Sequence, residues 1–225
     1  MNTNFETIKS EILRRAKEAH ACTEQFSRAY KSENMAQLCT VIKDNFWWAC
    51  NNKVLTVDLL EQYKIEFAEH EIYVNVSVER GFMLCDSATV KAYGSATVEA
   101  YGSATVKAYD SATVEAWGSA TVKAYDRATV EAWGSWGSAT VEAWGSATVE
   151  AWGSATVEAW GSATVKAYGS ATVKAYDSAT VEAWDNAYCT SYSTIECKLS
   201  DNAIYRVRSS NIVYYASDDI KFEKQ

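Results

Sequence analysis

An eight-residue phrase, SATVKAYG with small variations, occurs twelve times between residues 87 and 185 and limits the fold more than any other feature. Its second, fourth and sixth positions are always Ala, Val and Ala. Its third position is always Thr, its fifth is Lys or Glu, and its seventh is Tyr or Trp. This period of two predicts that each octad is a β-strand with a small apolar face and a large polar and aromatic face. The eighth position is Gly or Asp, which tolerate positive φ and suit a corner.

The pairing of these strands follows from which residues would share a face. Two-residue hairpins would mix large and small side chains on both faces of a meander. Three-residue loops would pair Lys with Glu and keep one face apolar, but a single sheet would leave that face exposed. A parallel stack places like positions above one another, and two octads with two tight corners can close one coil around Ala and Val. We therefore favour a two-sided parallel β-solenoid with two octads in each coil.

Residues 103–134 support the double unit, because their octads end alternately in KAYD and EAWG. One side of the coil would then present Lys with Tyr, and the other Glu with Trp. The same arrangement stacks like charges about 4.8 Å apart, which destabilises the stack unless exposed side chains splay and salt screens them. The two columns contain Lys91, Lys107 and Lys123, and Glu99, Glu115 and Glu131.

The repeat extends beyond its perfect copies and defines a second domain, residues 71–225. Counting back by eights gives two earlier octads from Glu71, and counting forward from Asn186 gives five degenerate octads that end at Gln225. We expect the degenerate, charged end to cap the solenoid from about residue 186, since an open sheet edge invites aggregation. A three-residue insertion, residues 135–137, predicts a small loop at a corner that presents Trp136.

Residues 1–70 lack the octad, and their apolar residues have helical spacing. We predict about four helices, so the fold class is α+β: an N-terminal small helical bundle capping a parallel two-sided β-solenoid. Phe46, Trp47 and Trp48 form the densest aromatic cluster. Adjacent helical residues point about 100° apart, so all three cannot enter one core. They either seal the bundle onto the repeat domain or form an exposed hot spot for a partner.

Charge and hydropathy disfavour several classes of protein. The net charge is −8, and residues 71–225 contain twelve Lys or Arg against nineteen Asp or Glu. This balance disfavours nucleic-acid binding, which needs cationic faces. The N-terminal residues have no apolar leader and the chain has no long apolar run, so we expect no membrane association and a cytoplasmic location. The six cysteines are then expected to be reduced thiols, mostly in the core.

No recognisable catalytic or metal-binding constellation occurs in the sequence. The two histidines, His20 and His70, have no neighbouring metal-ligand pattern. No nucleophile–base pair, P-loop or dinucleotide fingerprint is present. The Glu column repeats one exposed position, so nothing is expected to separate the pKa values of its members. We therefore predict no enzyme activity, no metal and no cofactor.

Three segments together resemble one group of proteins. They are VIKDNFWWACNN followed by VLTVDLLEQY, the ATVxAY[GD] octads, and NAYCTSYSTIECKLSDNAIYR. The combination resembles uncharacterised octapeptide-repeat proteins of gut Bacteroidetes and their mobile elements. The resemblance covers nearly the whole chain and implies this architecture and a bacterial intracellular or phage context. It implies no activity and assigns no functional residue.

We predict a non-catalytic binding or scaffold protein whose outward rings and charges form a rigid ladder for a protein partner. The alternatives are a phage or mobile-element inhibitor that imitates nucleic acid, a carbohydrate-binding protein, and a structural rod that self-associates through solenoid ends or faces. The residues predicted to form the ladder are Tyr93, Tyr109, Trp117, Trp133, Trp136, Trp144, Trp152, Trp160, Glu142, Glu150 and Glu158.

Overall fold

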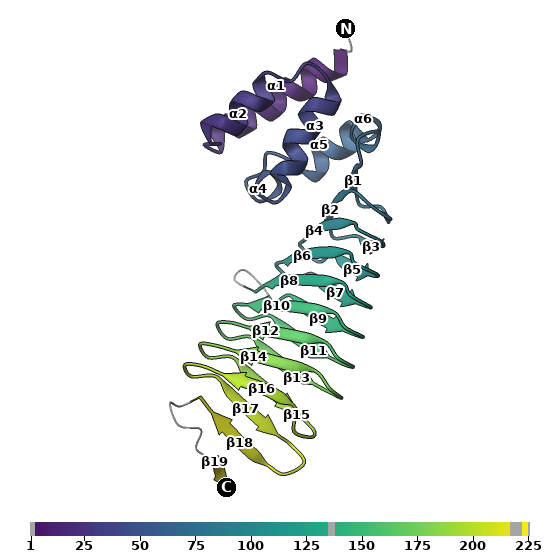
Figure 1. The fold of residues 1–225 in the computed structure, drawn as a ribbon. Coiled ribbons are helices and arrows are strands. Elements are labelled where there is room, and N and C mark those ends of the chain that lie inside the picture. The colour runs from purple at the N-terminus through teal and green to yellow at the C-terminus, as the bar shows by residue number, and fades with distance from the viewer. Residues whose placement is uncertain (1–2, 135–137, 217–221, 225) are drawn as a thin grey trace.

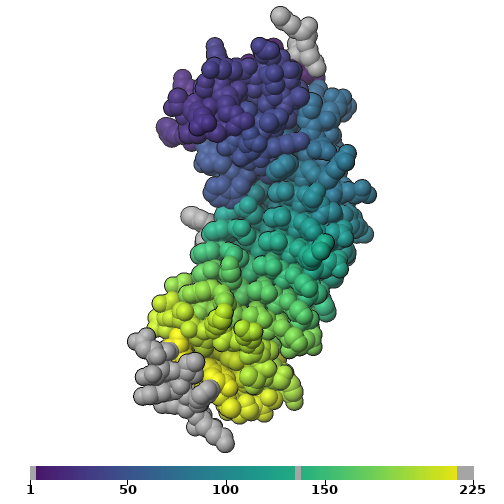
Figure 2. Space-filling view, viewed as in Figure 1, coloured from purple at the N-terminus to yellow at the C-terminus, as the bar shows by residue number. Residues whose placement is uncertain are grey.

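A computed structural model of the chain describes residues 3–134, 138–216 and 222–224. Helices form a compact domain at one end, and the strands that follow wind into a column of stacked coils (Figure 1). The space-filling view shows the helical domain seated on the first coils (Figure 2). Among the described residues, no helix is long and apolar enough to cross a membrane. The predicted fold class, a helical cap on a parallel two-sided β-solenoid, is confirmed.

Six helices form the cap in the part of the chain that the structure describes. They are α1 (Thr3–Glu18), α2 (Thr23–Tyr30), α3 (Met35–Asp44), α4 (Phe46–Asn51), α5 (Val57–Gln62) and α6 (Lys64–Ala68). Their apolar faces meet in one core, where Ile8, Leu38 and Leu60 are each at most 1% exposed. Burial of these faces, rather than helix propensity, stabilises helices as short as α4 to α6.

The sequence predicted about four helices, and more are found because two of the expected helices break. The chain leaves helical geometry at Asn45 (φ −130°, ψ 28°) between α3 and α4, and at Tyr63 (φ −120°, ψ 38°) between α5 and α6. The Asn45 amide donates a hydrogen bond to the carbonyl of Val41 and so satisfies a group at the helix end. The break gives α4 its own direction, in which Phe46 packs on Phe82 of the repeat domain.

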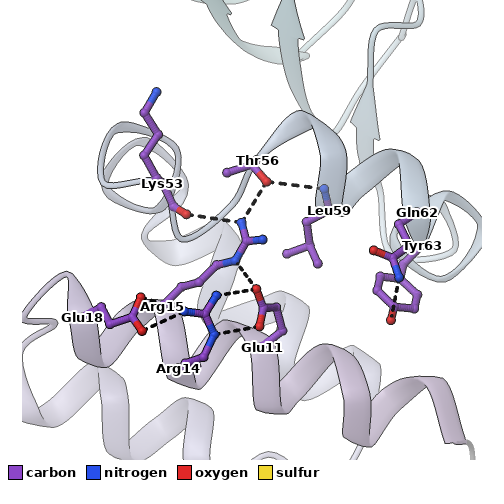
Figure 3. A network of polar contacts seen from close by, with 9 residues as sticks. All are labelled: Glu11, Arg14, Arg15, Glu18, Lys53, Thr56, Leu59, Gln62 and Tyr63. Carbon is purple, nitrogen blue, oxygen red and sulfur yellow. Dashed lines mark hydrogen bonds and ion pairs between the residues drawn. The ribbon is translucent and has the colours of Figure 1, made fainter.

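A polar network joins α1 to the start of α5 (Figure 3). Arg15 donates from Nε to Glu11 over 2.6 Å and from Nη1 to the hydroxyl of Thr56 over 2.9 Å. The same Nη1 lies 3.5 Å from the carbonyl oxygen of Lys53. Bonds from Arg14 and Arg15 lower the pKa of Glu11 to about 2. The network holds the loop between α4 and α5 against α1, next to the first coil of the solenoid.

The repeat domain forms two sheets that face each other across a narrow interior. Sheet A consists of β1 (Ile72–Val74), β2 (Phe82–Asp86), β4 (Thr97–Tyr101), β6 (Thr113–Trp117), β8 (Thr129–Trp133), β10 (Thr148–Trp152), β12 (Thr164–Ala167), β14 (Thr180–Ala183) and β16 (Glu196–Leu199). Sheet B consists of β3 (Thr89–Ala92), β5 (Thr105–Ala108), β7 (Thr121–Ala124), β9 (Thr140–Ala143), β11 (Thr156–Ala159), β13 (Thr172–Ala175), β15 (Tyr188–Ser191), β17 (Ile204–Val207), β18 (Ile212–Tyr215) and β19 (Phe222–Lys224). From β2 to β17 successive strands alternate between the sheets, so each coil contains one strand of each.

Octads two apart in the sequence lie directly above one another, parallel and in register. In sheet B, β11 pairs with β9 and β13, and the Thr, Val and Ala positions each pair with their own kind. From Val90 to Ala183 the inward Ala and Val side chains are at most 1% exposed. Cys189 and Cys197, which share the fourth position, face each other across this interior, and their contact raises the pKa of the Cys189 thiol. The prediction of a parallel stack with two octads per coil is confirmed.

The insertion leaves the stack undisturbed. Stacked partners such as Thr97 and Thr113 are sixteen residues apart, whereas Thr129 pairs with Thr148 across the insertion. The insertion falls between β8 and β9 in the sequence, and both sheets keep their register across it. The predicted loop itself, with Trp136, lies outside the described residues.

In β2, which belongs to the first full coil, the inward positions lie one residue later than counting back by eights predicts. Counting back by eights turns Phe82 and Leu84 inward. In the structure Met83 and Cys85 instead lie beside the inward Val and Ala of β4 and face the solenoid interior. Phe82 and Leu84 pack in the helical core, and so do Ile72 and Val74, which counting back by eights wrongly turns into the solenoid interior. The cap is the physical reason, because it buries the outer face of β2 and makes an apolar outer face favourable there.

The last two degenerate octads, which counting by eights includes in the repeat, do not continue the parallel stack. β18 pairs with β17, and β19 with β18, in antiparallel orientation at the edge of sheet B. Asn211, with a φ of 54°, lies in the turn before β18, and its side-chain oxygen accepts a hydrogen bond from Arg206 over 2.7 Å. This tight reversal returns the chain along the same sheet instead of carrying it round a corner to sheet A. Within the described residues, sheet A therefore ends at β16.

Candidate binding faces of the solenoid

The outward side chains line up along the column on both faces, and we name these columns files. Ring file A, on sheet A, contains Tyr101, Trp117, Trp133, Trp152, Tyr168 and Trp184. Ring file B, on sheet B, contains Tyr93, Tyr109, Tyr125, Trp144, Trp160 and Tyr176. Charge file A contains Glu99, Glu115, Glu131, Glu150, Lys166, Glu182 and Lys198. Charge file B contains Lys91, Lys107, Lys123, Glu142, Glu158 and Lys174.

The rings of each file stack on one another. In ring file A the centroids of Trp117 and Trp133 are 5.1 Å apart at an interplanar angle of 3°, and those of Trp133 and Trp152 are 5.2 Å apart at 8°. In ring file B the centroids of Trp144 and Trp160 are 4.2 Å apart at 7°. The flat faces of the rings are thus covered by their neighbours, and the ring edges point outward, although the indole N–H groups of Trp133 and Trp152 are buried. Trp144 is 37% exposed.

Opposite charges that neighbour one another in a file form ion pairs along the solenoid axis. The pairs are Lys166–Glu150 at 3.0 Å, Lys198–Glu182 at 3.0 Å, Lys123–Glu142 at 2.8 Å and Lys174–Glu158 at 3.0 Å. Toward the cap the files contain like charges. In the described part of the chain no ion pair involves Lys91 or Lys107 on sheet B, or the three glutamates nearest the cap on sheet A. Near the cap, the outward charge positions are therefore lysines on sheet B and glutamates on sheet A.

Glu99, at the cap end of charge file A, is buried. It is 1% exposed, and its Oε2 accepts hydrogen bonds from the Tyr101 hydroxyl over 3.4 Å and from the Trp117 indole N–H over 3.3 Å. Burial, followed by the charge of Glu115, raises the pKa of Glu99 to about 9. Burial and the charge of Glu131 raise the pKa of Glu115 to about 7. The expectation of identical exposed glutamates was wrong, because the cap covers this end of sheet A.

The three adjacent aromatic residues of the cap have separate positions. Phe46 packs on Phe82 of β2, with ring centroids 5.0 Å apart. Trp47 lies against Trp117 of ring file A, with centroids 6.3 Å apart, and stays 42% exposed. Trp48 packs against the helical core. Phe46 and Trp47 thus join the cap to sheet A, and α4 overlies the first layers of that face.

The predicted ladder residues do not form a single surface. Trp117, Trp133, Trp152 and Glu150 belong to sheet A. Tyr93, Tyr109, Trp144, Trp160, Glu142 and Glu158 belong to sheet B, on the opposite side of the column. The sequence-based selection left out the remaining ring and charge positions, among them Tyr101, Lys107 and Trp184. These residues could have been found from the sequence, because they occupy the seventh or fifth position of the octad, as the selected residues do.

Other arrangements in the described residues offer less for chemistry. No group of three or more His, Cys, Asp and Glu side chains there could hold a metal ion. A cleft of about 250 Å³ lies where cap and solenoid meet, and Cys50, Lys53, Asp86 and Tyr101 are among its lining residues. Burial raises the pKa of the Cys50 thiol, so the reactive thiolate is disfavoured. The regular faces are therefore the stronger candidate for a functional site.

No protein-family model, no curated protein and no solved structure matches this chain. The resemblance to octapeptide-repeat proteins stays a prediction. Function is accordingly argued from the geometry of the two faces.

Proposed function

We propose that the chain is a non-catalytic binding protein that holds a protein partner on the outer face of sheet B. The observation that carries this proposal is ring file B, whose stacked rings present their edges to solvent. The cap packs on the other side, where α5 contacts β1 and β2 of sheet A. Tight packing of the Ala and Val interior keeps this face rigid, so little conformational entropy is lost when a partner binds.

The chemistry of this face suits a protein surface. Tyr and Trp edges combine apolar C–H groups with O–H or N–H donors, and such side chains are enriched in protein interfaces. Lys91 and Lys107 lie beside the rings with no ion pair among the described residues, so they are available to carboxylates of a partner. Further along the face, Glu142 and Glu158 offer the opposite charge. The favoured partner surface is therefore acidic toward the cap and mixed in charge beyond it.

The ring geometry speaks against carbohydrate binding. A sugar stacks on the flat face of an aromatic ring. The interplanar angles of 12° between Tyr93 and Tyr109, and 5° between Trp160 and Tyr176, leave those flat faces occupied by neighbouring rings. Edges alone do not provide a stacking platform.

The charge distribution speaks against mimicry of nucleic acid. A mimic needs a dense row of ionised carboxylates, comparable to the phosphates of a strand. In charge file A, Glu99 is buried and protonated at neutral pH, and Glu115 is only partly ionised there. Charge file B begins with three lysines. No face of the described residues therefore presents a long, fully ionised acidic row.

The test compares matched double variants on the two faces. A partner is captured from a bacterial lysate on the full-length chain and purified, and its affinity is then measured by calorimetry. Trp144→Thr with Trp160→Thr removes two adjacent rings from ring file B and is expected to weaken binding at least tenfold. Trp133→Thr with Trp152→Thr removes two adjacent rings from ring file A and is expected to change the affinity less than twofold.

Circular dichroism checks that both double variants keep the solenoid. Loss of binding in the ring file A variant with retention in the ring file B variant would place the partner on the wrong face for this proposal. A captured nucleic-acid enzyme whose binding depends on Glu131 and Glu150, and not on the rings, would support mimicry instead.

A further inference from the structure

We infer that the half of sheet A farthest from the cap is a self-association face, on which two copies of the chain pair with antiparallel solenoid axes. We call it lower face A, and it is formed by Glu150, Trp152, Lys166, Tyr168, Glu182, Trp184 and Lys198 on β10, β12, β14 and β16. It lies opposite the proposed partner face on sheet B, so the two proposals hold or fail independently.

Charge complementarity carries the inference. Along lower face A the charges alternate as Glu150, Lys166, Glu182 and Lys198. A twofold axis parallel to the strands, between β12 and β14, reverses this order in the second copy. Glu150 then faces Lys198 of the second copy, and Lys166 faces Glu182 of the second copy. All four layers of the face are matched, with no like charges opposite one another.

The same axis brings the ring files together. Because it runs along the strands, ring file A stays on the same side of the face in both copies. Tyr168 then lies opposite Trp184 of the second copy, and the half-buried ring edges of both are removed from water. Aromatic contact adds apolar burial to the ionic pairing. Each lysine keeps its ion pair along the axis at 3.0 Å, so the interface charges form a network of two facing columns with four charges each.

The cap decides which arrangements are possible. Helix α4 overlies the first layers of sheet A, where Trp47 lies against Trp117 and Glu99 is buried. In the antiparallel pair β10 faces β16 of the second copy. The described strands of sheet A end at β16, so no strand of the second copy's sheet A lies at the level of α4. The cap thus blocks the upper part of the face and leaves the lower part accessible.

Other pairings of the same surfaces are less favourable. If two copies pack sheet A against sheet A with parallel axes, every charged residue lies opposite the same residue of the second copy, so like charges meet in every layer. On sheet B, antiparallel pairing about the boundary between Lys123 and Glu142 matches the four layers from Lys107 to Glu158 and then places Lys91 opposite Lys174. Sheet A packed on sheet B in register would drive α4 into the first strands of the second copy. Lower face A in antiparallel pairing avoids each of these conflicts.

The size of the face sets the expected affinity. Four layers at about 4.8 Å and strands of four to five residues at about 3.3 Å each give a contact roughly 19 Å by 15 Å. The planar area is then about 285 Å² on each copy, which is smaller than that of a standard specific interface, so we expect a weak dimer with a dissociation constant on the order of 100 μM. Ionic pairing at the surface is screened by salt, so the dimer is expected to weaken as ionic strength rises.

The test reverses single charges on lower face A and then mixes two variants whose reversed charges are complementary. Lys166→Glu places a carboxylate opposite Glu182 of the second copy, and Glu182→Lys places an ammonium opposite Lys166 of the second copy. Each variant alone is expected to dimerise at least tenfold more weakly than the original chain in sedimentation equilibrium at low salt. A mixture of the two variants restores opposite charges in all four layers. It is expected to form a heterodimer within about threefold of the original affinity.

The matched control is Lys174→Glu, which breaks the equivalent ion pair, to Glu158, on sheet B. It is expected to dimerise like the original chain. If Lys166→Glu disturbs folding by circular dichroism, Lys166→Gln replaces it and should weaken the dimer with a smaller effect. A chain that stays monomeric at several hundred micromolar and low salt overturns the inference. So does equal dimerisation of all variants, or a mixture that fails to associate.

Discussion

At the residue scale, one repeat position has different chemistry at different heights in the column. The fifth position is Glu in both Glu99 and Glu182, within nearly identical octads. Glu182 forms an ion pair with Lys198, whereas Glu99 is enclosed by Tyr101, Trp117 and the cap. Among the described residues, no Lys, Arg or His side chain forms an ion pair with Glu99, and its hydrogen bonds come from Tyr101 and Trp117. Its raised pKa is a direct consequence of this enclosure.

The first prediction concerns the pH dependence of stability. The folded pKa of Glu99 is about 9 against an ordinary value of 4.5, so above pH 4.5 the folded state binds more protons than the unfolded state. Stability from this group therefore falls as pH rises from 4.5 through 9. Glu115, with a folded pKa of about 7, acts in the same direction. Lys53 is a nearby cation, whose Nζ lies 5.8 Å from the centre of the Tyr101 ring.

Glu99→Gln keeps an acceptor for Trp117 and removes the buried ionisable group. We expect it to stabilise the chain by about 1–3 kcal/mol at pH 9 and by much less at pH 6. Urea unfolding of both proteins between pH 5 and pH 9 measures the difference. The control is Glu142→Gln, on sheet B, whose pH profile should follow that of the original chain. Parallel profiles for Glu99→Gln and the original chain would show that Glu99 is not buried as an acid.

At the scale of the element, each coil depends on its corners. In the twelve octads between residues 87 and 185, the eighth position adopts positive φ at every corner except Gly134, for example 58° in Asp110 and 68° in Gly118. Where the residue is Asp, its carboxylate accepts a hydrogen bond from the backbone N–H of the corner one coil earlier. Asp177 bonds Gly161 over 3.0 Å in this way, and Asp185 bonds Gly169 over 2.8 Å. Asp at this position is thus a bond between coils as well as a residue that tolerates the turn.

The second prediction compares Gly118 and Gly134, which differ in the room available for an added side chain. A Cβ at Gly118 would meet only the backbone of Gly102 at 3.5 Å or more, so Gly118→Asp can reach the Gly102 N–H as other corner aspartates do. We expect its free energy of unfolding to stay the same or rise by about 0.5–1 kcal/mol. At Gly134 a Cβ would lie 2.5 Å from the backbone N of Ala155, so Gly134→Asp should lose about 1–3 kcal/mol. Denaturant unfolding ranks the three proteins, and an equal loss for both variants would contradict the corner bond.

At the scale of the whole molecule, the solenoid is a row of coils closed at each end by a different structure. Each coil buries its Ala and Val residues only against its neighbours, so stability is approximately a sum over coils and the contacts between them. The helical cap closes one end and packs in the same core as Phe82 and Leu84. At the other end the antiparallel strands β18 and β19 extend sheet B beyond β17. Coil number is therefore free to vary without changing either end.

The third prediction tests the sixteen-residue coil. Deletion of residues 146–161 removes two complete octads and joins equivalent corners. The shortened chain should keep its circular dichroism spectrum and lose about 4.8 Å of length by X-ray scattering, with only a modest fall in unfolding temperature. Deletion of residues 146–157 removes one and a half octads and ends a strand at its middle. It should lose cooperative unfolding, and similar behaviour of the two deletions would contradict the coil length.

Much of this architecture was predictable from residue patterns, and three of the failures share a cause. The inward Val and Ala positions, the parallel stacking and the helical character of residues 1–70 were all predicted. The slip at Met83 and Cys85, the break at Asn45 and the burial of Glu99 were not. Each of these depends on contact between cap and solenoid, which are distant in the sequence. The two opposite faces of the candidate site could have been assigned by counting octads, but the covered end of sheet A could not.

The sequence by itself determined the strand, its inward face and the parallel stack, because alternating small and large side chains can be packed in only one way when every unit is alike. Only the tertiary structure decided which members of identical columns are buried, paired or free. Identical octads have identical local preferences, so their differences arise from what lies above and below them. The cap at one end and the reversed strands at the other therefore make chemically distinct positions out of equal repeats.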